Sequence, residues 1–167
     1  MELTFKLASN NELKFVLQLL KEAALRLQEK KIDQWNYWLV PPPSKIDWIK
    51  EGVDKNEFHF ILLAEQIIGM FRLSIEDLLY WGREQVPAKY IHSFVISDRY
   101  TGKDIGAKVL ELVGQKMIAE GVFMLRLDCL AANKKLCAYY ERQDFSLIRK
   151  KELEGEWFNL YEKRLAP

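Results

Sequence analysis

The stretch Tyr-Ile-His-Ser-Phe-Val-Ile-Ser-Asp-Arg-Tyr-Thr-Gly-Lys-Asp-Ile-Gly, residues 90–106, decides the fold. Residues 90–96 form a nearly continuous apolar run, which is typical of a buried strand. The polar residues around Gly102 then predict a turn, and the chain continues as a helix that ends at Gly121. The buried stripe of this helix is predicted from apolar residues at helical spacing: Ile105, Val109, Leu112, Val113 and Met117. A strand, a glycine-bearing turn and a helix therefore follow one another directly.

The flanking segments predict further strands and helices. Before residue 90, the patterns predict a strand at 3–7, a helix from a capping box at 9–12 to about residue 31, an aromatic loop at 33–43, a short helix at 44–52, a hairpin of strands 58–64 and 67–75, and a loop at 76–87. After the central helix, they predict a strand at 123–130, a helix at 133–143, and a hairpin of strands 147–153 and 156–165. Hairpins followed by alternating strands and helices favour one mixed sheet with helices on both faces. We therefore expect an α+β, or mixed α/β, fold in a single domain spanning residues 1–167.

Length and composition narrow the class of protein. The chain has 167 residues, about the size of one domain, and its 25 Lys and Arg balance 24 Asp and Glu. A net charge of +1 gives no overall field to attract nucleic acid or an anionic membrane, so we expect neither as a partner. No apolar run approaches the roughly 20 residues of a membrane helix, and no signal-peptide pattern is present, which predicts a cytoplasmic protein. Cys129 and Cys137 lack C-x-x-C spacing and are expected to be reduced core residues.

The turn at residues 101–106 is the first candidate site. Backbone N–H groups at the start of a helix, together with the positive end of the helix dipole, bind anions such as phosphate. The turn matches neither G-x-x-x-x-G-K-[ST] nor G-x-G-x-x-G, so nucleotide hydrolysis and dinucleotide binding lose support. On the residues alone, a structural role for Gly102 and Gly106 stays open beside a phosphate-binding one.

A second motif, Tyr-Glu-Arg-Gln-Asp-Phe at residues 140–145, lies at the end of the predicted helix that follows Asn133. With Thr101-x-x-Asp104-x-Gly106 before it, the chain resembles the GNAT superfamily of acyl-CoA-dependent N-acetyltransferases over nearly its whole length. That family usually has Arg or Gln at position 101 and Gly at positions 104 and 144. The resemblance implies the acyl-CoA N-acyltransferase fold: a central, mostly antiparallel, twisted sheet of about six or seven strands, splayed between the fourth and fifth, with about four helices on its faces.

The resemblance also implies acetyl-CoA as the cosubstrate. The turn would hold the pyrophosphate, the strand at 90–96 would hold the pantetheine arm by backbone hydrogen bonds, and the N–H of Phe94 would point at the thioester oxygen. Asn133 matches a cofactor-contacting Asn of the family. The cofactor-binding residues implied in this way are Phe94, Val95, Ile96, Thr101, Gly102, Lys103, Asp104, Ile105, Gly106, Ala107 and Asn133.

Two residues carry the implied chemistry, which is direct attack of an amine on the thioester with no metal and no covalent enzyme intermediate. Tyr140 stands at the family's general-acid position, and its ordinary pKa of about 10 lies above the 8.5 or so of a thiol. The usual family base is a carboxylate near residue 90, where this chain has Tyr-Ile-His. His92 is therefore our first candidate for the base, with Glu76, Asp77 or a water molecule as alternatives. Tyr139 and His59 are expected to be structural.

The acceptor amine is the least defined part of the prediction. In this superfamily the segments containing Trp35, Trp38 and Trp81 form the acceptor side, and with Glu76 and Asp77 they would suit an aromatic or cationic amine of a small molecule or peptide. Packing of each tryptophan in the core or loops stays open. The rival function is a non-catalytic acyl-CoA sensor on the same fold, which Asp104 and the missing carboxylate at residue 90 favour. Homodimerisation is left open.

Overall fold

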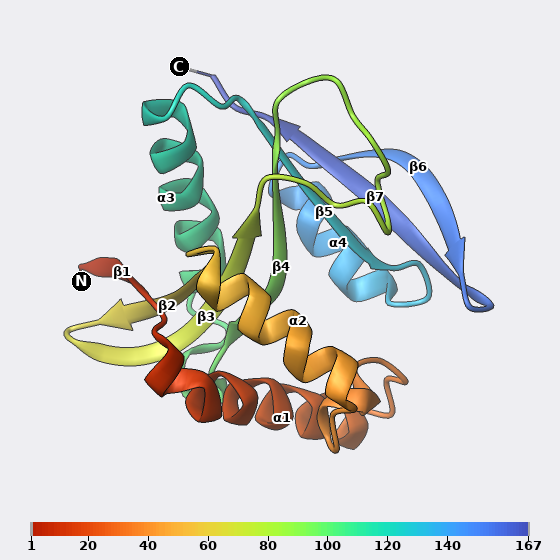
Figure 1. Cartoon of the computed structure of the whole chain (residues 1–167). Helices are drawn as coiled ribbons and strands as arrows, with labels where there is room; N and C mark the ends of the chain where they lie inside the picture. The colour runs from red at the N-terminus through yellow and green to blue at the C-terminus, as the bar shows by residue number, and fades with distance from the viewer. Residues whose placement is uncertain (1, 167) are drawn as a thin grey trace. The chain divides into compact units, whose positions relative to one another are not determined.

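The computed structural model describes residues 2–166, whose elements follow the order expected from the sequence (Figure 1). The strands are β1 (Leu3–Leu7), β2 (Phe58–Leu63), β3 (Gln66–Ser74), β4 (Lys89–Ile96), β5 (Met124–Leu130), β6 (Ser146–Leu153) and β7 (Glu156–Arg164). The α-helices are α1 (Leu13–Glu29), α2 (Pro43–Asp54), α3 (Ile105–Ala119) and α4 (Lys134–Arg142), and short 3-10 turns lie at Asn10–Glu12, Asn36–Trp38 and Asp98–Tyr100.

The seven strands are hydrogen-bonded in the order β1-β2-β3-β4-β5-β7-β6. The β1–β2, β2–β3, β5–β7 and β6–β7 pairs are antiparallel, and the β4–β5 pair is parallel. The parallel pair is short, because only Lys89 with Leu125 and Tyr90 with Arg126 stand opposite one another. Ser93, at φ +51°, then interrupts β4 in a conformation that is rare inside strands. These features confirm the predicted mixed, mostly antiparallel sheet whose fourth and fifth strands part.

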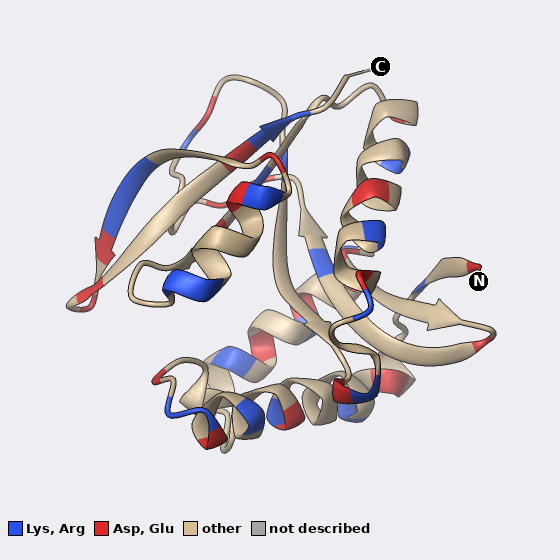
Figure 2. Cartoon of the chain, turned by 180° about the vertical axis from the view of Figure 1, so that it is seen from behind, with Lys and Arg blue, Asp and Glu red and all other residues tan. Residues whose placement is uncertain are grey.

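The chain divides into two compact units, and β4 contributes to both. The first unit comprises residues 1–73 and 93–106, and the second comprises residues 74–92 and 107–167. Acidic and basic residues are interleaved along α1 in the first unit and along α3, most of which lies in the second (Figure 2). Within residues 2–166, no helix is long and apolar enough to cross a membrane.

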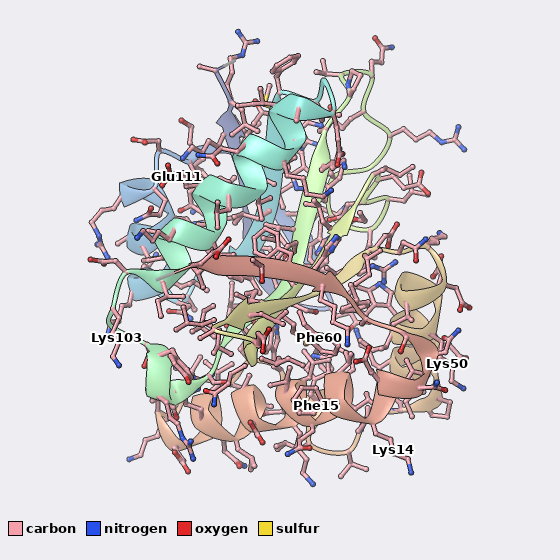
Figure 3. All side chains as sticks on the ribbon, turned by 90° about the vertical axis from the view of Figure 1, so that its left-hand side faces the viewer. Lys14, Phe15, Lys50, Phe60, Lys103 and Glu111 are labelled. Carbon is pink, nitrogen blue, oxygen red and sulfur yellow. The ribbon has the colours of Figure 1, made fainter. Side chains whose placement is uncertain are left out.

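The core of the first unit lies between the helices α1 and α2 and one face of its strands. Alternate residues of β2 point to this face, and Phe58 and Phe60 are almost completely buried there. Figure 3 shows Phe15 of α1 beside Phe60, and the two ring centroids lie 5.6 Å apart. On the opposite face, the His59 ring stacks on Phe71, with ring centroids 4.9 Å apart.

The end of the second helix differs from the prediction for a physical reason. The sequence predicts that Gly52 ends the second helix, but α2 continues to Asp54. Gly52 is instead a packing position, because a Cβ atom there would lie 2.5 Å from the Phe58 ring. The glycine lets β2 approach the helix closely, which the sequence pattern alone does not reveal.

In the second unit, β5 lies between β4 and β7, and α4 follows β5 along the chain. The inward face of α4 carries Cys137 and Tyr140, both buried. Tyr161 of β7 is fully buried, and its hydroxyl donates a hydrogen bond to Glu141 of α4 at 2.9 Å. The β5 strand and α4 therefore fix the surroundings of the second motif.

Candidate active site

Asp77, His92 and Asp128 form a group of titratable side chains in the second unit, with one oxygen or nitrogen atom of each within 4.8 Å of the others. Asp77 Oδ2 lies 3.5 Å from His92 Nε2, and Asp128 Oδ2 lies 3.7 Å from His92 Nδ1. The exposed fractions of these side chains are only 6% for Asp77, 16% for His92 and 13% for Asp128. The imidazole ring therefore stands between two largely buried carboxyl groups.

The register of two strands explains why His92 meets Asp128. Tyr90 of β4 stands opposite Arg126 of β5, and Arg126 donates a hydrogen bond to the Tyr90 hydroxyl at 2.9 Å. Side chains two residues apart on a strand share a face. His92 and Asp128 each lie two residues beyond this pair, so the same face brings them together where the ladder ends.

Asp77 is held in place by the loop between β3 and β4. Its backbone carbonyl accepts hydrogen bonds from Trp81 and Gly82, both at 3.0 Å, and its Oδ1 accepts one from the Tyr80 N–H at 3.0 Å. Trp81 anchors this loop, because Arg149 of β6 donates to the Trp81 carbonyl at 2.7 Å. The loop therefore directs the Asp77 carboxylate toward His92.

Burial changes the acid–base chemistry of Asp128. Loss of solvation, and secondly the negative charge of Asp77, raise the pKa of Asp128 to about 8. A carboxyl group with this pKa is mostly protonated at pH 7 and half ionised at about pH 8. Such groups are concentrated at sites that exchange protons.

Tyr140 lies on the same unit, packed among aromatic rings. Its ring centroid is 5.7 Å from that of Phe145 and 6.4 Å from that of Tyr161. Burial, followed by the charge of Cys129, raises the pKa of Tyr140 well above its ordinary value. The hydroxyl is therefore protonated throughout the physiological pH range, as a proton donor requires. Tyr139 packs edge-on against Tyr140, with ring centroids 5.5 Å apart.

The two cysteines are buried neighbours of this region. Their sulfur atoms lie 3.4 Å apart, and both are free thiols, as the sequence predicts. Burial raises the pKa of Cys129, which keeps the thiol protonated and unreactive. Asn159 donates a hydrogen bond to the Cys137 sulfur at 3.4 Å.

The glycine-bearing turn lies in the first unit and is tied to α1. Arg26 donates hydrogen bonds to the Ile96 carbonyl at 3.1 Å and to Asp98 at 2.8 Å. Beside this contact is a cavity of about 260 Å³, lined by Leu19, Glu22, Leu25, Arg26, Glu29, Val95, Ser97 and Asp98. Figure 3 shows Lys103 at the outer edge of the turn.

Asp104 adopts a left-handed backbone conformation, with φ +55°, directly before α3 begins. Glycine is the usual residue in this conformation, and Asp and Asn tolerate it better than most others. The conformation accounts for an aspartate where GNAT-like sequences usually have glycine. Residues 101–104 are all exposed.

Comparison with known proteins supplies the family. The model of the acetyltransferase (GNAT) family matches residues 18–145, which include the β4 strand, the turn and the motif in α4. The chain belongs to the GNAT family. Membership supports N-acetyltransferase activity in general, because acetyl transfer is the activity that gives the family its name.

GNAT relatives match the chain over most of its length. An uncharacterized N-acetyltransferase, YesJ of Bacillus subtilis, is 24% identical over 153 residues, which cover 89% of this chain and 82% of that protein. The crystal structure of a GNAT acetyltransferase from Listeria monocytogenes superposes with a TM-score of 0.79 at 21% identity, covering 99% of this chain and 96% of the other. The PaiA N-acetyltransferase of Thermoplasma acidophilum, solved in complex with coenzyme A, gives 0.62 at 18% identity, covering 98% and 99%. These structural likenesses confirm the GNAT fold.

The cofactor-binding residues that the GNAT resemblance implies lie on the expected elements. Phe94, Val95 and Ile96 form the end of β4, beyond the interruption at Ser93. Residues 101–107 form the turn and the first residues of α3. Asn133 caps α4, because its side-chain oxygen accepts a hydrogen bond from the Leu136 N–H at 3.2 Å. Contact of these residues with acetyl-CoA stays a prediction.

Of the three tryptophans that were expected on the acceptor side of a GNAT site, two are buried. Trp38 and Trp81 are each only 3% exposed. Trp38 belongs to the core between α1, α2 and the strands, whereas Trp81 lies 4.7 Å from the Arg126 guanidinium and anchors the loop that carries Asp77. Trp35 is half-buried against the same core as Trp38, and Glu76 is exposed. Trp38 and Trp81 therefore pack in the interior, and contact of Trp35, Trp38, Trp81, Glu76 or Asp77 with an acceptor stays a prediction.

The sequence interpretation missed Asp128. It considered His92 and Asp77 separately and did not expect either to meet a carboxyl group on β5. The signal was present, because β5 reads Met-Leu-Arg-Leu-Asp-Cys-Leu and carries an acidic residue in an otherwise buried strand. A charged residue in such a strand is rarely buried without a partner or a function.

Proposed function

We propose that this protein transfers the acetyl group of acetyl-CoA to a primary amine of a small molecule or peptide. The amine attacks the thioester directly, without a metal and without a covalent enzyme intermediate. We also propose that residues 1–167 form a single GNAT domain. The family match supports the reaction class, and the CoA complex of the PaiA enzyme supports the choice of cosubstrate.

The observation that carries the proposal is the group formed by Asp77, His92 and Asp128. An acceptor amine arrives mainly as its ammonium ion and must lose a proton before its nitrogen attacks the carbonyl carbon. The group offers acid–base atoms within 4.8 Å of one another, from β4, from β5 and from the loop before β4. We propose that this group supplies the base in place of the carboxylate that is missing near residue 90.

Tyr140 is proposed as the proton donor to the departing thiolate. The ordinary pKa of tyrosine exceeds that of a thiol by about 1.5 units, so proton transfer to the thiolate costs about 2 kcal/mol, and burial increases this cost. The transfer is feasible when Tyr140 takes up the excess proton of the attacking nitrogen in the same step. Tyr140 then passes a proton from nitrogen to sulfur and ends the reaction unchanged.

The turn and the start of α3 are proposed to bind the pyrophosphate of acetyl-CoA. The exposed residues 101–104 leave their backbone accessible, and the first N–H groups of a 15-residue helix have no partners within the helix. Lys103 adds a positive charge on the exposed edge of the turn. The Asp104 carboxylate opposes the phosphates unless its side chain turns into solvent, so we expect it to contribute only its backbone N–H.

Acetyl-CoA turnover tests the proposal. The purified chain is incubated with acetyl-CoA and a panel of amines, peptides and aminoglycoside-type antibiotics, and release of free CoA thiol is measured. We expect at least one amine to be acetylated, and acetyl-CoA at about 100 times its dissociation constant to add about 2.7 kcal/mol to the free energy of unfolding. Stabilisation by acetyl-CoA without turnover of any acceptor would favour the acyl-CoA sensor, and the absence of both would contradict the proposal.

A further inference from the structure

We propose that Asp128, and not His92, takes the proton from the substrate ammonium, and that His92 and Asp77 are positioning residues for Asp128. The inference rests on the proposed acetyl-transfer reaction and assigns a catalytic residue within it. It follows from the orientation of three side chains in the second unit.

His92 has both ring nitrogens turned toward protein carboxyl groups. Nε2 faces Asp77 and Nδ1 faces Asp128, at the 3.5 and 3.7 Å given above. A neutral imidazole has one N–H and one lone pair, so each nitrogen has a protein group in front of it. An ammonium ion would have to displace one of these carboxyl groups to reach the lone pair.

Asp77 is also turned inward. One of its oxygens accepts a hydrogen bond from the Tyr80 N–H, and the other faces His92. Its side chain is 6% exposed, the smallest fraction of the three. The geometry therefore suits an electrostatic and orienting role rather than contact with a substrate.

Asp128 differs from both residues. One of its oxygens faces His92, and its carboxyl group also accepts a hydrogen bond from its own backbone N–H; within residues 2–166, His92 is the only side chain that forms an ion pair with it. Its side chain is 13% exposed, about twice the fraction of Asp77. Asp128 is thus the more exposed of the two carboxyl groups and the one more open to a ligand.

The charges around Asp128 suit a base that works near neutral pH. The titratable groups that face it are Asp77 of the loop, His92 of β4, Cys129 of its own strand and Tyr140 of α4. Burial and the charge of Asp77 raise its pKa to about 8, and general bases are most effective when their pKa lies near the working pH.

The proposed step balances as follows. Ionised Asp128 accepts one proton from R–NH₃⁺ to give R–NH₂ and a neutral carboxyl group. The nitrogen lone pair then forms the C–N bond to the acetyl carbon, and the C–S bond breaks. The second nitrogen proton passes through Tyr140 to the thiolate, which leaves as CoA–SH. Asp128 returns its proton to solvent, so one proton is released for each amide formed.

The pH dependence of kcat/KM tests the assignment. Asp128→Asn, His92→Asn and Asp77→Asn are compared with the wild-type protein, with the acetyl-CoA thermal shift as the check on folding and binding. We expect Asp128→Asn to lower kcat/KM at pH 8 by at least 100-fold and to abolish its acidic limb. We expect His92→Asn to keep that limb at a lower rate, and Asp77→Asn to move it to lower pH because a negative charge is removed. Asp128→Ser replaces Asp128→Asn if the amide variant fails to fold.

A second measurement does not depend on turnover. The chain has two histidines, so His92→Asn assigns the His92 ring signals in an NMR titration of the protein alone. We expect these signals to follow a proton equilibrium near pH 8 that is lost in Asp128→Asn. An unchanged titration in that variant overturns the proposal even if no acceptor is found, whereas a failed acceptor screen alone contradicts only the proposed function.

Three other results would overturn the assignment of Asp128 as the base or of His92 as a positioning residue. An acidic limb that persists in Asp128→Asn overturns the assignment, and a limb lost in both Asp128→Asn and His92→Asn overturns the positioning role of His92. Wild-type activity that is lost in EDTA and restored by Zn²⁺ would show that the three residues bind a metal, which also overturns it.

Discussion

Replacing Asp128 with Asn is expected to stabilise the protein, by an amount that grows with pH. The pKa of the Asp128 carboxyl group is about 8 in the folded protein and about 3.9 in an unfolded chain. Between these values the folded state binds more protons than the unfolded state, so the wild-type free energy of unfolding falls as pH rises. Each pKa unit corresponds to 1.36 kcal/mol, and about three units lie between the unfolded value and pH 7, which gives a cost of about 4 kcal/mol at pH 7.

The Asn side chain has the same shape and does not titrate, so this cost disappears in the variant. Urea unfolding at pH 5 and pH 7.5 measures it, with Asp47→Asn on the exposed side of α2 as the matched control. We expect the gain from Asp128→Asn to be larger at pH 7.5 by between about 1 and 3 kcal/mol, and Asp47→Asn to change little at either pH. A gain that does not depend on pH, or a loss that grows with pH, would refute the reasoning.

Three further predictions concern the donor, the sheet and the turn. Tyr140→Phe should lower kcat by about 100-fold while the acetyl-CoA thermal shift stays nearly unchanged, and full activity in this variant would assign the proton donor elsewhere. Gly69→Ala would place a Cβ 2.1 Å from the Val95 carbonyl oxygen, so we expect a loss of about 3 kcal/mol in urea unfolding, and a loss below about 0.5 would contradict that packing. Asp104→Asn should tighten acetyl-CoA binding by less than about tenfold in calorimetry, with a smaller gain at high salt, and weaker binding would mean that the carboxylate organises the turn.

The sequence predicts most of the fold because the decisive patterns are local. The apolar run at 90–96, the turn around Gly102 and the helical spacing after it each depend on residues close together in the chain. The predicted helix end at Gly52 is wrong because this glycine serves packing and does not end the helix. The Phe58 ring, which belongs to β2, lies so close that a side chain at residue 52 would clash with it. A sequence pattern distinguishes a helix-ending glycine from a packing glycine only when the partner is known.

The site is less predictable than the fold because it is formed by contacts between residues that are far apart in the sequence. His92 meets Asp128 because the register of β4 against β5 pairs Tyr90 with Arg126, and this register is a property of two strands separated by α3. Asp77 joins them only because Trp81 and its contacts fix the loop. Residue types identified His92 and Asp77 as candidates, but their grouping depends on contacts between distant segments.

The proposed catalytic use of Asp128 and its cost in stability have one origin. Burial beside Asp77 disfavours the ionised carboxyl group, and the same free energy that raises its pKa toward the working pH is lost from the folded state. A lysine or arginine placed against Asp128 would recover that stability and would also keep the group ionised and weakly basic. Within residues 2–166, the partner that the fold does provide is a histidine held by a second carboxylate, which leaves the proton affinity of Asp128 high. Stability and basicity at residue 128 are therefore expected to change in opposite directions in any variant that alters its surroundings.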